Sequence, residues 1–551
     1  MSHLPALTAV AVVVLVTLLV AAYGTRVSRT TGDFYVASRA VRPWWNASAI
    51  GGEYLSAASF LGVAGLVLLE GADALWFPIG YTVGYLLLLT LVAAPLRRSG
   101  AYTLPDFAEL RLGSARARTA SAVVVVLVGW LYLLPQFTAA GLVWSSATGL
   151  PRWIGTVIVA VVVCGAVAGG GMRSITIVQA VQYWLKLTAI AVPACVLLAL
   201  WGLQGAPASQ APPGWAVPSS DPADLYSTYS LLLALLLGTM GLPHVLTRFY
   251  TNPDGTDARR TTRTVIGLLG LFYVWPPLYA VLAWRLAPEL ATPGRADTLV
   301  VDLPGIAVPG TLGTVLGAVA LGGAFAAFLS TASGLTVAVS GVLARDLVPG
   351  AGGGDARAVA RFRVATVGAL VVPVGVALLG IDVPLAATVG LAFALAASTF
   401  APLLLLGIWW DGLRTGPALL GMAVGGTAAA LAAVLTLTGA TRRAAPGLAA
   451  ALEQPAAWTV PLAVAVMVVG SLLRSAADRR SGTRVPAPAV APALLHRPEV
   501  RTSYLPPLSS AADPARAPGR PEARGGAPDG AASTGATAPP TARRRGPTAR
   551  R

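Results

Sequence analysis

The sequence predicts an all-α polytopic membrane protein, and three observations lead to this fold class. Of its 551 residues, 55% are hydrophobic and only 11% are charged, which is typical of chains that cross a bilayer many times. The apolar residues form runs long enough to cross a hydrocarbon layer of ~30 Å as helices. Glycine or proline interrupts two of these runs at their centres, which predicts helices that are broken within the membrane.

Thirteen segments are long and apolar enough to be transmembrane helices. The first has no basic residue before it and is too long for the core of a signal peptide, so we expect it to be retained. The predicted spans cover about 4–24, 44–69, 73–96, 119–147, 152–170, 174–203, 225–250, 262–286, 308–345, 360–380, 384–409, 415–438 and 456–474.

Arginines in the loops predict the orientation of the chain. They follow spans 1, 3, 5, 7, 9 and 11, which places these loops on the cytoplasmic side. With thirteen spans, the N-terminus then lies outside and the C-terminus inside. The exceptions are Arg285 and Arg295 near the end of span 8, and Arg442 and Arg443 in the loop before span 13.

The net charge of +16 does not indicate nucleic-acid binding, because the arginines lie in loops and in the C-terminal segment. Cys164 and Cys195 both fall in apolar spans, so neither a disulfide framework nor a cysteine metal site is expected. Residues 476–551 are rich in Pro, Ala, Gly and Arg, which predicts a disordered cytoplasmic tail.

Span 2 carries an energetic anomaly at its centre, the segment Ala49 to Gly62. Glu53 in lipid would cost several kcal/mol, and Gly51-Gly52 disfavours a helix interior. Both features are tolerated where a broken helix faces a cavity. The alternative is a kinked helix in which a neighbouring side chain satisfies Glu53.

Span 7 is interrupted in a similar way by Gly238, Gly241 and Pro243. It lies five spans after span 2, so the two cross the membrane in opposite directions. This arrangement predicts an inverted-repeat secondary transporter, although paired kinks for packing would give the same pattern. We expect an extra helix in 1–30, a 5+5 core in 31–410 (spans 2–6 in 44–203, spans 7–11 in 225–409), two added helices in 411–475, and the tail.

Several motifs resemble the sodium:solute symporter family, over roughly residues 30 to 475. The segment from Gly51 to Gly62 resembles its second span, and Gly238 to Phe249 resembles its seventh span in the acetate and monocarboxylate branch. Further matching segments are 33–37, 102–106, 132–136, 170–173 and 390–398.

The resemblance implies one sodium site between spans 2 and 9 and no organic cofactor. The matching ligands are the carbonyl oxygens of Gly52, Leu55 and Ala327 and the hydroxyls of Ser330 and Thr331. Oxygen ligands suit such a hard cation. The alternative for Ser330 and Thr331 is ordinary packing between membrane helices. Some relatives of the acetate type lack hydroxyls at these two positions, whereas this sequence has both. This difference favours sodium over protons as the coupling ion.

A short carboxylate needs hydrogen-bond donors and an apolar wall. The polar candidates are Tyr54, Ser56, Gln136 and Thr239, and the aromatic candidates are Trp130, Tyr132 and Phe60. A role in helix packing is the alternative for Gln136, Trp130 and Tyr132.

Charged residues near the two breaks are candidates for gating. Glu53 replaces the Asp that is usual at this position of the acetate branch, so it is expected to attract the cation or hold a proton rather than to ligate. Arg248 is expected to gate or to anchor the helix at the interface, and His244 to be structural or to relay protons. Lys186, the only lysine, fits either a snorkelling residue or a buried pair.

The sequence therefore predicts a multi-pass cell-membrane transporter that takes up a small monocarboxylate, such as acetate, propionate or pyruvate, with sodium. Alternatives keep the fold but carry proline, pantothenate, urea or a sugar, or use protons. A membrane sensor or enzyme is a remote alternative, since the chain has no His-Glu-x-x-His, Gly-x-Ser-x-Gly or phosphate-loop motif.

Overall fold

The fold was analysed in a computed structural model, which describes residues 4–27, 41–206, 208–347, 355–380, 385–481, 490 and 492–496. Every regular element within these residues is a helix, which confirms the all-α prediction. The described residues belong to one compact unit, Met1–Glu499. Eleven helical segments among them are long and apolar enough to cross a membrane.

Two of the eleven segments each join two of the predicted spans. Arg152–Leu203 contains 52 residues, and within it Gly171 has the non-helical angles φ 57° and ψ −157°. Ala58–Leu91 contains the 3-10 turn η3 (Gly71–Leu75). These two turns explain why eleven segments correspond to thirteen predicted spans. The number of separate crossings and the sidedness of the loops stay predictions.

The first predicted repeat begins with a span in three pieces. Its helices are α3 (Pro43–Tyr54), the π-helical turn η2 (Ala58–Gly62), α4 (Val63–Glu70), α5 (Trp76–Leu91), α6 (Ala93–Arg98), α7 (Leu104–Leu112), α8 (Ala115–Thr148) and α9 (Arg152–Leu203). The matching segment 102–106 forms the start of α7, where the Thr103 side chain accepts a hydrogen bond from the Asp106 backbone N–H at 3.2 Å. This is an N-cap, so the motif has a structural role.

The second predicted repeat also begins with a broken span. Its helices are α10 (Pro222–Gly241), α11 (Pro243–Phe249), α12 (Gly255–Tyr273), α13 (Trp275–Leu286), η4 (Pro288–Leu290), η5 (Ala296–Thr298), α14 (Leu299–Ala307), α15 (Gly310–Val342), the π-helical η6 (Leu343–Leu347), α16 (Asp355–Leu378), α17 (Leu385–Ala397) and α18 (Phe400–Trp409).

The two broken spans pack in corresponding ways. Helix α3 lies against α9, the last helix of its repeat, and α10 lies against α17 in the other repeat. Glycines permit both approaches. A Cβ on Gly52 would lie 2.1 Å from the Gln179 carbonyl oxygen, and one on Gly238 would lie 2.5 Å from the Phe393 carbonyl oxygen. The repeated contact agrees with the predicted internal symmetry.

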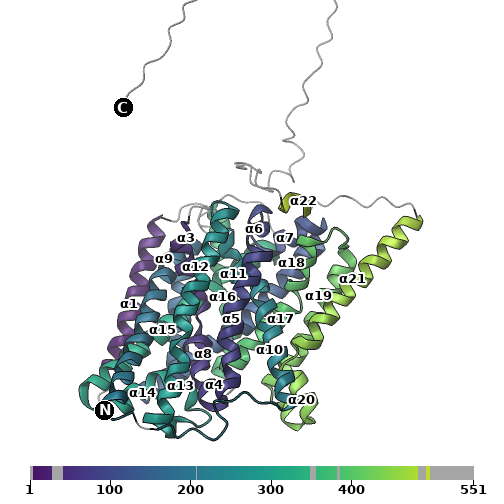
Figure 1. The fold of residues 1–551 in the computed structure, drawn as a ribbon. Coiled ribbons are helices and arrows are strands. Elements are labelled where there is room, and N and C mark those ends of the chain that lie inside the picture. The colour runs from purple at the N-terminus through teal and green to yellow at the C-terminus, as the bar shows by residue number, and fades with distance from the viewer. Residues whose placement is uncertain are drawn as a thin grey trace, which may run out of the picture. The chain divides into compact units, whose positions relative to one another are not determined.

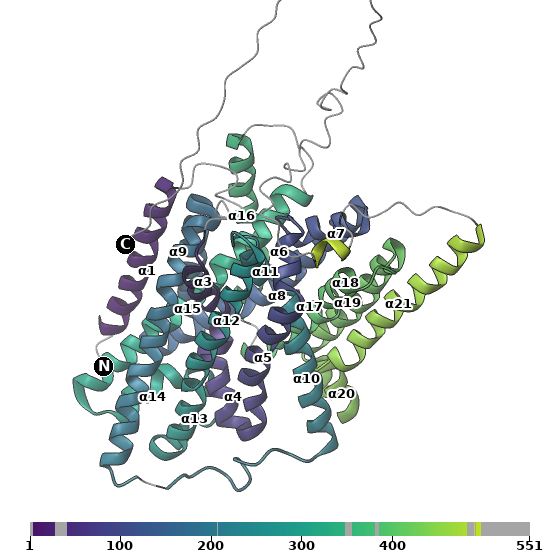
Figure 2. The same ribbon diagram turned by 45° about the horizontal axis from the view of Figure 1, so that its top comes forward.

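Helices outside the repeats lie at two edges of the unit (Figures 1 and 2). Helix α1 (Leu4–Val27) packs on α9 and α15, while α19 (Thr415–Leu437), η7 (Ala440–Arg443), α20 (Pro446–Glu453) and α21 (Ala456–Ser481) lie beside α10 and α18. The predicted start of the tail at residue 476 falls inside α21. The short helix α22 (Pro492–Leu495) also lies in the predicted tail, and its Leu495 carbonyl accepts from Arg98 Nη1 at 3.0 Å. The rest of the tail and segment 33–37 lie outside the described residues.

Substituting Gly52 with alanine is expected to destabilise the protein by about 1–3 kcal/mol, as overpacking does. The new methyl group would meet backbone rather than a flexible side chain, so α3 and α9 must move apart. Thermal unfolding of the purified protein in detergent measures the effect. Gly165→Ala is the control, because a Cβ at Gly165 of α9 meets nothing within 4 Å. Equal unfolding temperatures for the two variants would contradict this packing.

Candidate cation and solute site

The break in span 2 lies three residues beyond its glycine pair. Helix α3 ends at Tyr54, Leu55 has the non-helical ψ of 83°, and η2 begins at Ala58. The glycine pair itself is helical and serves the close approach to α9, which corrects the expectation that it marks the break. Leaving the helix here frees backbone groups of residues 52–57 for other partners.

The predicted sodium ligands lie together at this break. Ser330 Oγ of α15 lies 2.7 Å from the Gly52 carbonyl oxygen and 3.1 Å from that of Ala327. Thr331 Oγ1 donates to the carbonyl oxygen of Glu53 at 2.6 Å. The two hydroxyls therefore hold α15 against the last turn of α3.

The ammonium of Lys186 occupies the centre of this group. Its Nζ donates to the carbonyl oxygens of Gly52 and Leu55, the latter at 2.8 Å, and to Ser330 Oγ at 2.9 Å. The lysine comes from α9 and is fully buried. Three of the five predicted sodium ligands thus bind an amino group of the chain itself.

Sodium and the Lys186 ammonium cannot occupy these oxygen atoms together. The oxygen atoms are suited to a hard cation, but three of them are already hydrogen-bonded to Nζ. A metal ion at the same oxygens would lie within about 4 Å of the ammonium, where two unit positive charges repel by about 4 kcal/mol at an effective dielectric constant of ~20. One cation has to leave before another enters.

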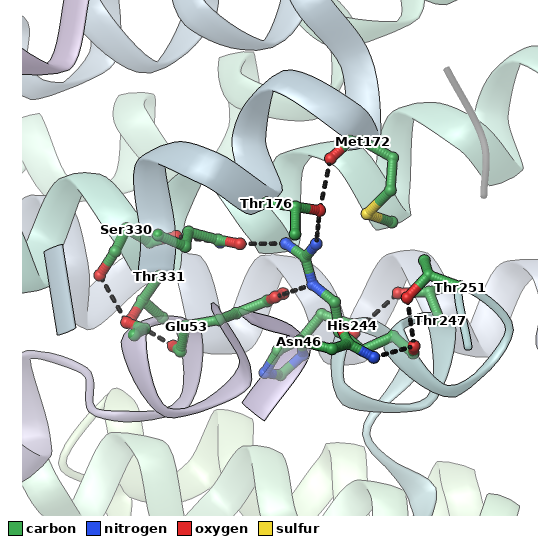
Figure 3. A network of polar contacts seen from close by, with 12 residues as sticks. Asn46, Glu53, Met172, Thr176, His244, Thr247, Thr251, Ser330 and Thr331 are labelled. Carbon is green, nitrogen blue, oxygen red and sulfur yellow. Dashed lines mark hydrogen bonds and ion pairs between the residues drawn. The ribbon is translucent and has the colours of Figure 1, made fainter. Parts of the chain in front are cut away.

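A second polar cluster surrounds Arg248 of α11, next to the break in span 7 (Figure 3). Arg248 Nε donates to Glu53 Oε2 at 2.6 Å, and its terminal nitrogens donate to Thr176 Oγ1 at 2.6 Å and to Gln179 Oε1. Asn46 Nδ2 donates to the Arg248 carbonyl at 3.0 Å. The Arg248 side chain is fully buried, so it is not the interfacial anchor that snorkelling would require.

Glu53 therefore binds Arg248. Its carboxylate lies over α15 at Gly334, where a Cβ would come within 2.0 Å of Glu53 Oε1. Gln179 connects the two clusters, because its amide nitrogen also donates to the Ser330 carbonyl at 2.7 Å. The ion pair and the cation site share one hydrogen-bonded network.

Most of the predicted solute residues lie on the other side of the break, among aromatic rings. Tyr54 packs edge to face on Tyr81 and Tyr85, with ring centroids 5.8 and 4.8 Å apart. Its hydroxyl lies 3.2 Å from Thr239 Oγ1. The Tyr132 ring lies 5.2 Å from that of His244. Ser56, at the break itself, is fully buried.

Gln136 and Trp130, both on α8, have different surroundings. Gln136 Oε1 accepts the backbone N–H of Ala57 at 2.9 Å, so it binds a donor that the break has freed. Trp130 Nε1 donates to the Ala369 carbonyl of α16 at 3.0 Å. It packs with Val126 and Val339, and its indole N–H is directed to α16.

The break in span 7 lies at Leu242, whose ψ is 115°, and Pro243 opens α11. Proline fits the first turn of a helix because the backbone N–H there is free of intrahelical bonds. His244 follows and is fully buried. The short helix then carries Arg248 to the centre of the second cluster.

Sequence reasoning did not include Lys186, Gln179 and Thr176 in the site. They are spaced three and seven residues apart, which puts them on one face of α9. An apolar span with this polar stripe and the only lysine of the chain carried a usable signal.

The paired broken helices and the buried polar centre define a secondary transporter of the inverted-repeat class. The family model of the sodium:solute symporter family matches residues 34–425, and the chain belongs to this family. Sodium is the coupling ion of the family, so the chain is a multi-pass sodium-coupled transporter of the cell membrane and not an enzyme.

Two solved structures resemble this chain to different degrees. A Na+-coupled sialic acid symporter, in a substrate-bound outward-open state, is 13% identical with a TM-score of 0.65, covering 85% of this chain and 97% of its own. A manganese transporter of Eremococcus coleocola is 14% identical with a TM-score of 0.48, covering 80% and 95%. The first likeness supports the fold alone.

Proposed function

We propose that this chain carries a small monocarboxylate, of the acetate, propionate or pyruvate type, into the cell. The family establishes solute transport, and the chemistry of the buried centre supports this solute. Opposite motions of the two repeats would expose the centre to each side in turn.

The observation that carries the proposal is the set of ionisable side chains in the buried centre. Glu53, Arg248 and Lys186 are all buried and belong to one network. With their usual charges they leave one positive charge unbalanced. Buried charge is costly without a counter-charge, so a monovalent anion is favoured over neutral urea or sugar and over zwitterionic proline.

Unpartnered polar groups next to the break supply the second support. The hydroxyls of Tyr81 and Tyr85 and both ring nitrogens of His244 are buried without a hydrogen-bond partner among the described residues. Such groups cost free energy unless a ligand or water binds them. A carboxylate could accept from the two hydroxyls and from the His244 ring nitrogen that carries the proton. Phe393, within 5.2 Å of Tyr81 and 5.9 Å of Tyr132 between ring centroids, would contact its alkyl end.

The predicted solute residues take distinct parts in this proposal. Ser56 and Tyr132 would contact the solute directly. Tyr54, Thr239 and Gln136 would hold the broken helix in place through the hydrogen bonds described above. Trp130 would not contact the solute, because its indole faces α16.

Uptake of radiolabelled acetate into proteoliposomes of the purified full-length chain tests the proposal. We expect uptake with an inward sodium gradient, and competition by propionate and pyruvate but not by proline, urea or glucose. Competition by pantothenate would indicate a site that accepts carboxylates in general, and no competition would indicate a site for short acids. A choline gradient and a proton gradient, each without sodium, test the alternative coupling ion. No carboxylate uptake under any gradient would disprove the proposed solute.

Tyr81→Phe combined with Tyr85→Phe is expected to raise the KM for the acid about tenfold, since each change removes a donor worth about 0.5–1.5 kcal/mol. Neither hydroxyl bonds to the described protein, so stability should change little. Initial uptake rates against acid concentration measure the KM. Tyr229→Phe is the control, because Tyr229 is 68% exposed. An unchanged KM in the double variant would remove these hydroxyls from the solute site.

A further inference from the structure

Lys186 is bound as a free metal ion would be bound. An ammonium has three donors, and all three find acceptors here: two carbonyl oxygens of the α3 break and the hydroxyl of Ser330. Two of these acceptors belong to α3 and its break and one belongs to α15. The side chain therefore joins the elements between which a sodium site was expected.

The lysine has no carboxylate partner within the described residues, unlike most buried lysines. Its Nζ makes no ion pair there, and the nearby carboxylate of Glu53 binds Arg248. The hydrogen bonds of the ammonium go only to uncharged oxygen atoms. Neutral carbonyl and hydroxyl oxygens in a buried cage form a ligand set for a bare cation, and here that cation is attached to α9.

We propose that the ammonium of Lys186 is a tethered cation that occupies the sodium site, and that sodium and Lys186 are alternative occupants of this site. Sodium enters only when the lysine side chain withdraws from Gly52, Leu55 and Ser330. While Lys186 is bound, it holds the α3 break against α15 without any ion from solution. The site thus has a built-in competitor that the predicted ligand set did not include.

Because Lys186 is attached to the chain, it competes strongly with sodium for the site. A group attached to the same chain acts at an effective concentration in the millimolar range or above. Sodium must therefore compete with a local cation that dilution cannot remove. Removing the lysine amino group should raise the apparent affinity for sodium, provided that the oxygen cage stays in place.

Equilibrium binding of ²²Na⁺ to the purified full-length chain in detergent tests the proposal. Lys186→Met keeps an unbranched side chain without the charge, and we expect it to bind sodium at least tenfold more tightly than the unmodified protein. The control is Gln182→Met on the same helix. The buried amide of Gln182 donates to Thr17 Oγ1 at 3.0 Å, away from the site. It should leave sodium binding unchanged.

Two further variants locate the effect. Adding Ser330→Ala to Lys186→Met should abolish the gained binding, because the sodium would lose a ligand. If Lys186→Met is not monodisperse on size exclusion, Lys186→Gln replaces it, since its amide keeps hydrogen-bond donors without a charge. Equal sodium affinities in the unmodified protein and in the folded uncharged variant would overturn the proposal. No solute is present, so the result is independent of whether the solute is a monocarboxylate.

Discussion

Arg248→Met is expected to lower the free energy of unfolding by about 3–5 kcal/mol, the usual cost of removing one partner from a buried ion pair. The change leaves the Glu53 carboxylate buried without its counter-charge and removes the donors to Thr176 and Gln179. Thermal or chemical unfolding in detergent measures the loss. A surface control is Arg260→Met, since Arg260 is 62% exposed and 3.5 Å from Asp257, where an ion pair contributes about 0–1 kcal/mol.

A double-mutant cycle with Glu53→Gln distinguishes loss of the ion pair from loss of packing. Glu53→Gln combined with Arg248→Met removes both charges, so it should be more stable than Arg248→Met alone. If the loss of unfolding free energy in the double variant equals the sum of the losses in the two single variants, the residues are not coupled. The prediction would then be wrong even if Arg248→Met unfolds readily.

Ser330→Ala combined with Thr331→Ala is expected to reduce the initial rate of solute uptake at least tenfold at a fixed sodium concentration. The first change removes a ligand of Lys186 and a contact to Gly52, and the second removes the hydrogen bond to the Glu53 carbonyl. Helix α15 would lose its polar contacts with the break. Uptake rates in proteoliposomes, together with the half-saturating sodium concentration, measure the effect.

Ser333→Ala is the matched control for this pair. Ser333 lies on the same helix and is buried, but its hydroxyl has no partner among the described residues. Its removal should leave both the rate and the sodium requirement near those of the unmodified chain. An equal loss of uptake rate in Ser333→Ala and in the double variant would contradict a specific role for Ser330 and Thr331. The loss would then reflect the packing of α15.

The sequence was sufficient to predict the two broken spans, because Gly and Pro act locally on the backbone. It located the second break correctly and the first only approximately. Gly51 and Gly52 are helical, and they are glycines because Tyr183 and Gln179 of α9 lie against them. Local propensity cannot distinguish a glycine that breaks a helix from one that admits a neighbouring helix.

Sequence patterns could not predict contacts between residues far apart in the chain. Glu53 and Arg248 are separated by 195 positions, and no periodicity connects them. Lys186 posed a different difficulty. Its position in an apolar span left snorkelling and burial equally open, and only the packing of α9 on α3 and α15 directs it to the break. The direction of a helix face in the assembled bundle decided its surroundings.

Gly171 gives α9 a kink, since its angles of φ 57° and ψ −157° belong to a region open essentially to glycine alone. The part of α9 beyond this kink carries Thr176, Gln179 and Lys186. A rotation about this single residue would turn all three side chains as one lever, moving the contacts of Arg248 and of the cation site in the same step. The electrostatic centre and the cation cage therefore both take side chains from the same part of α9.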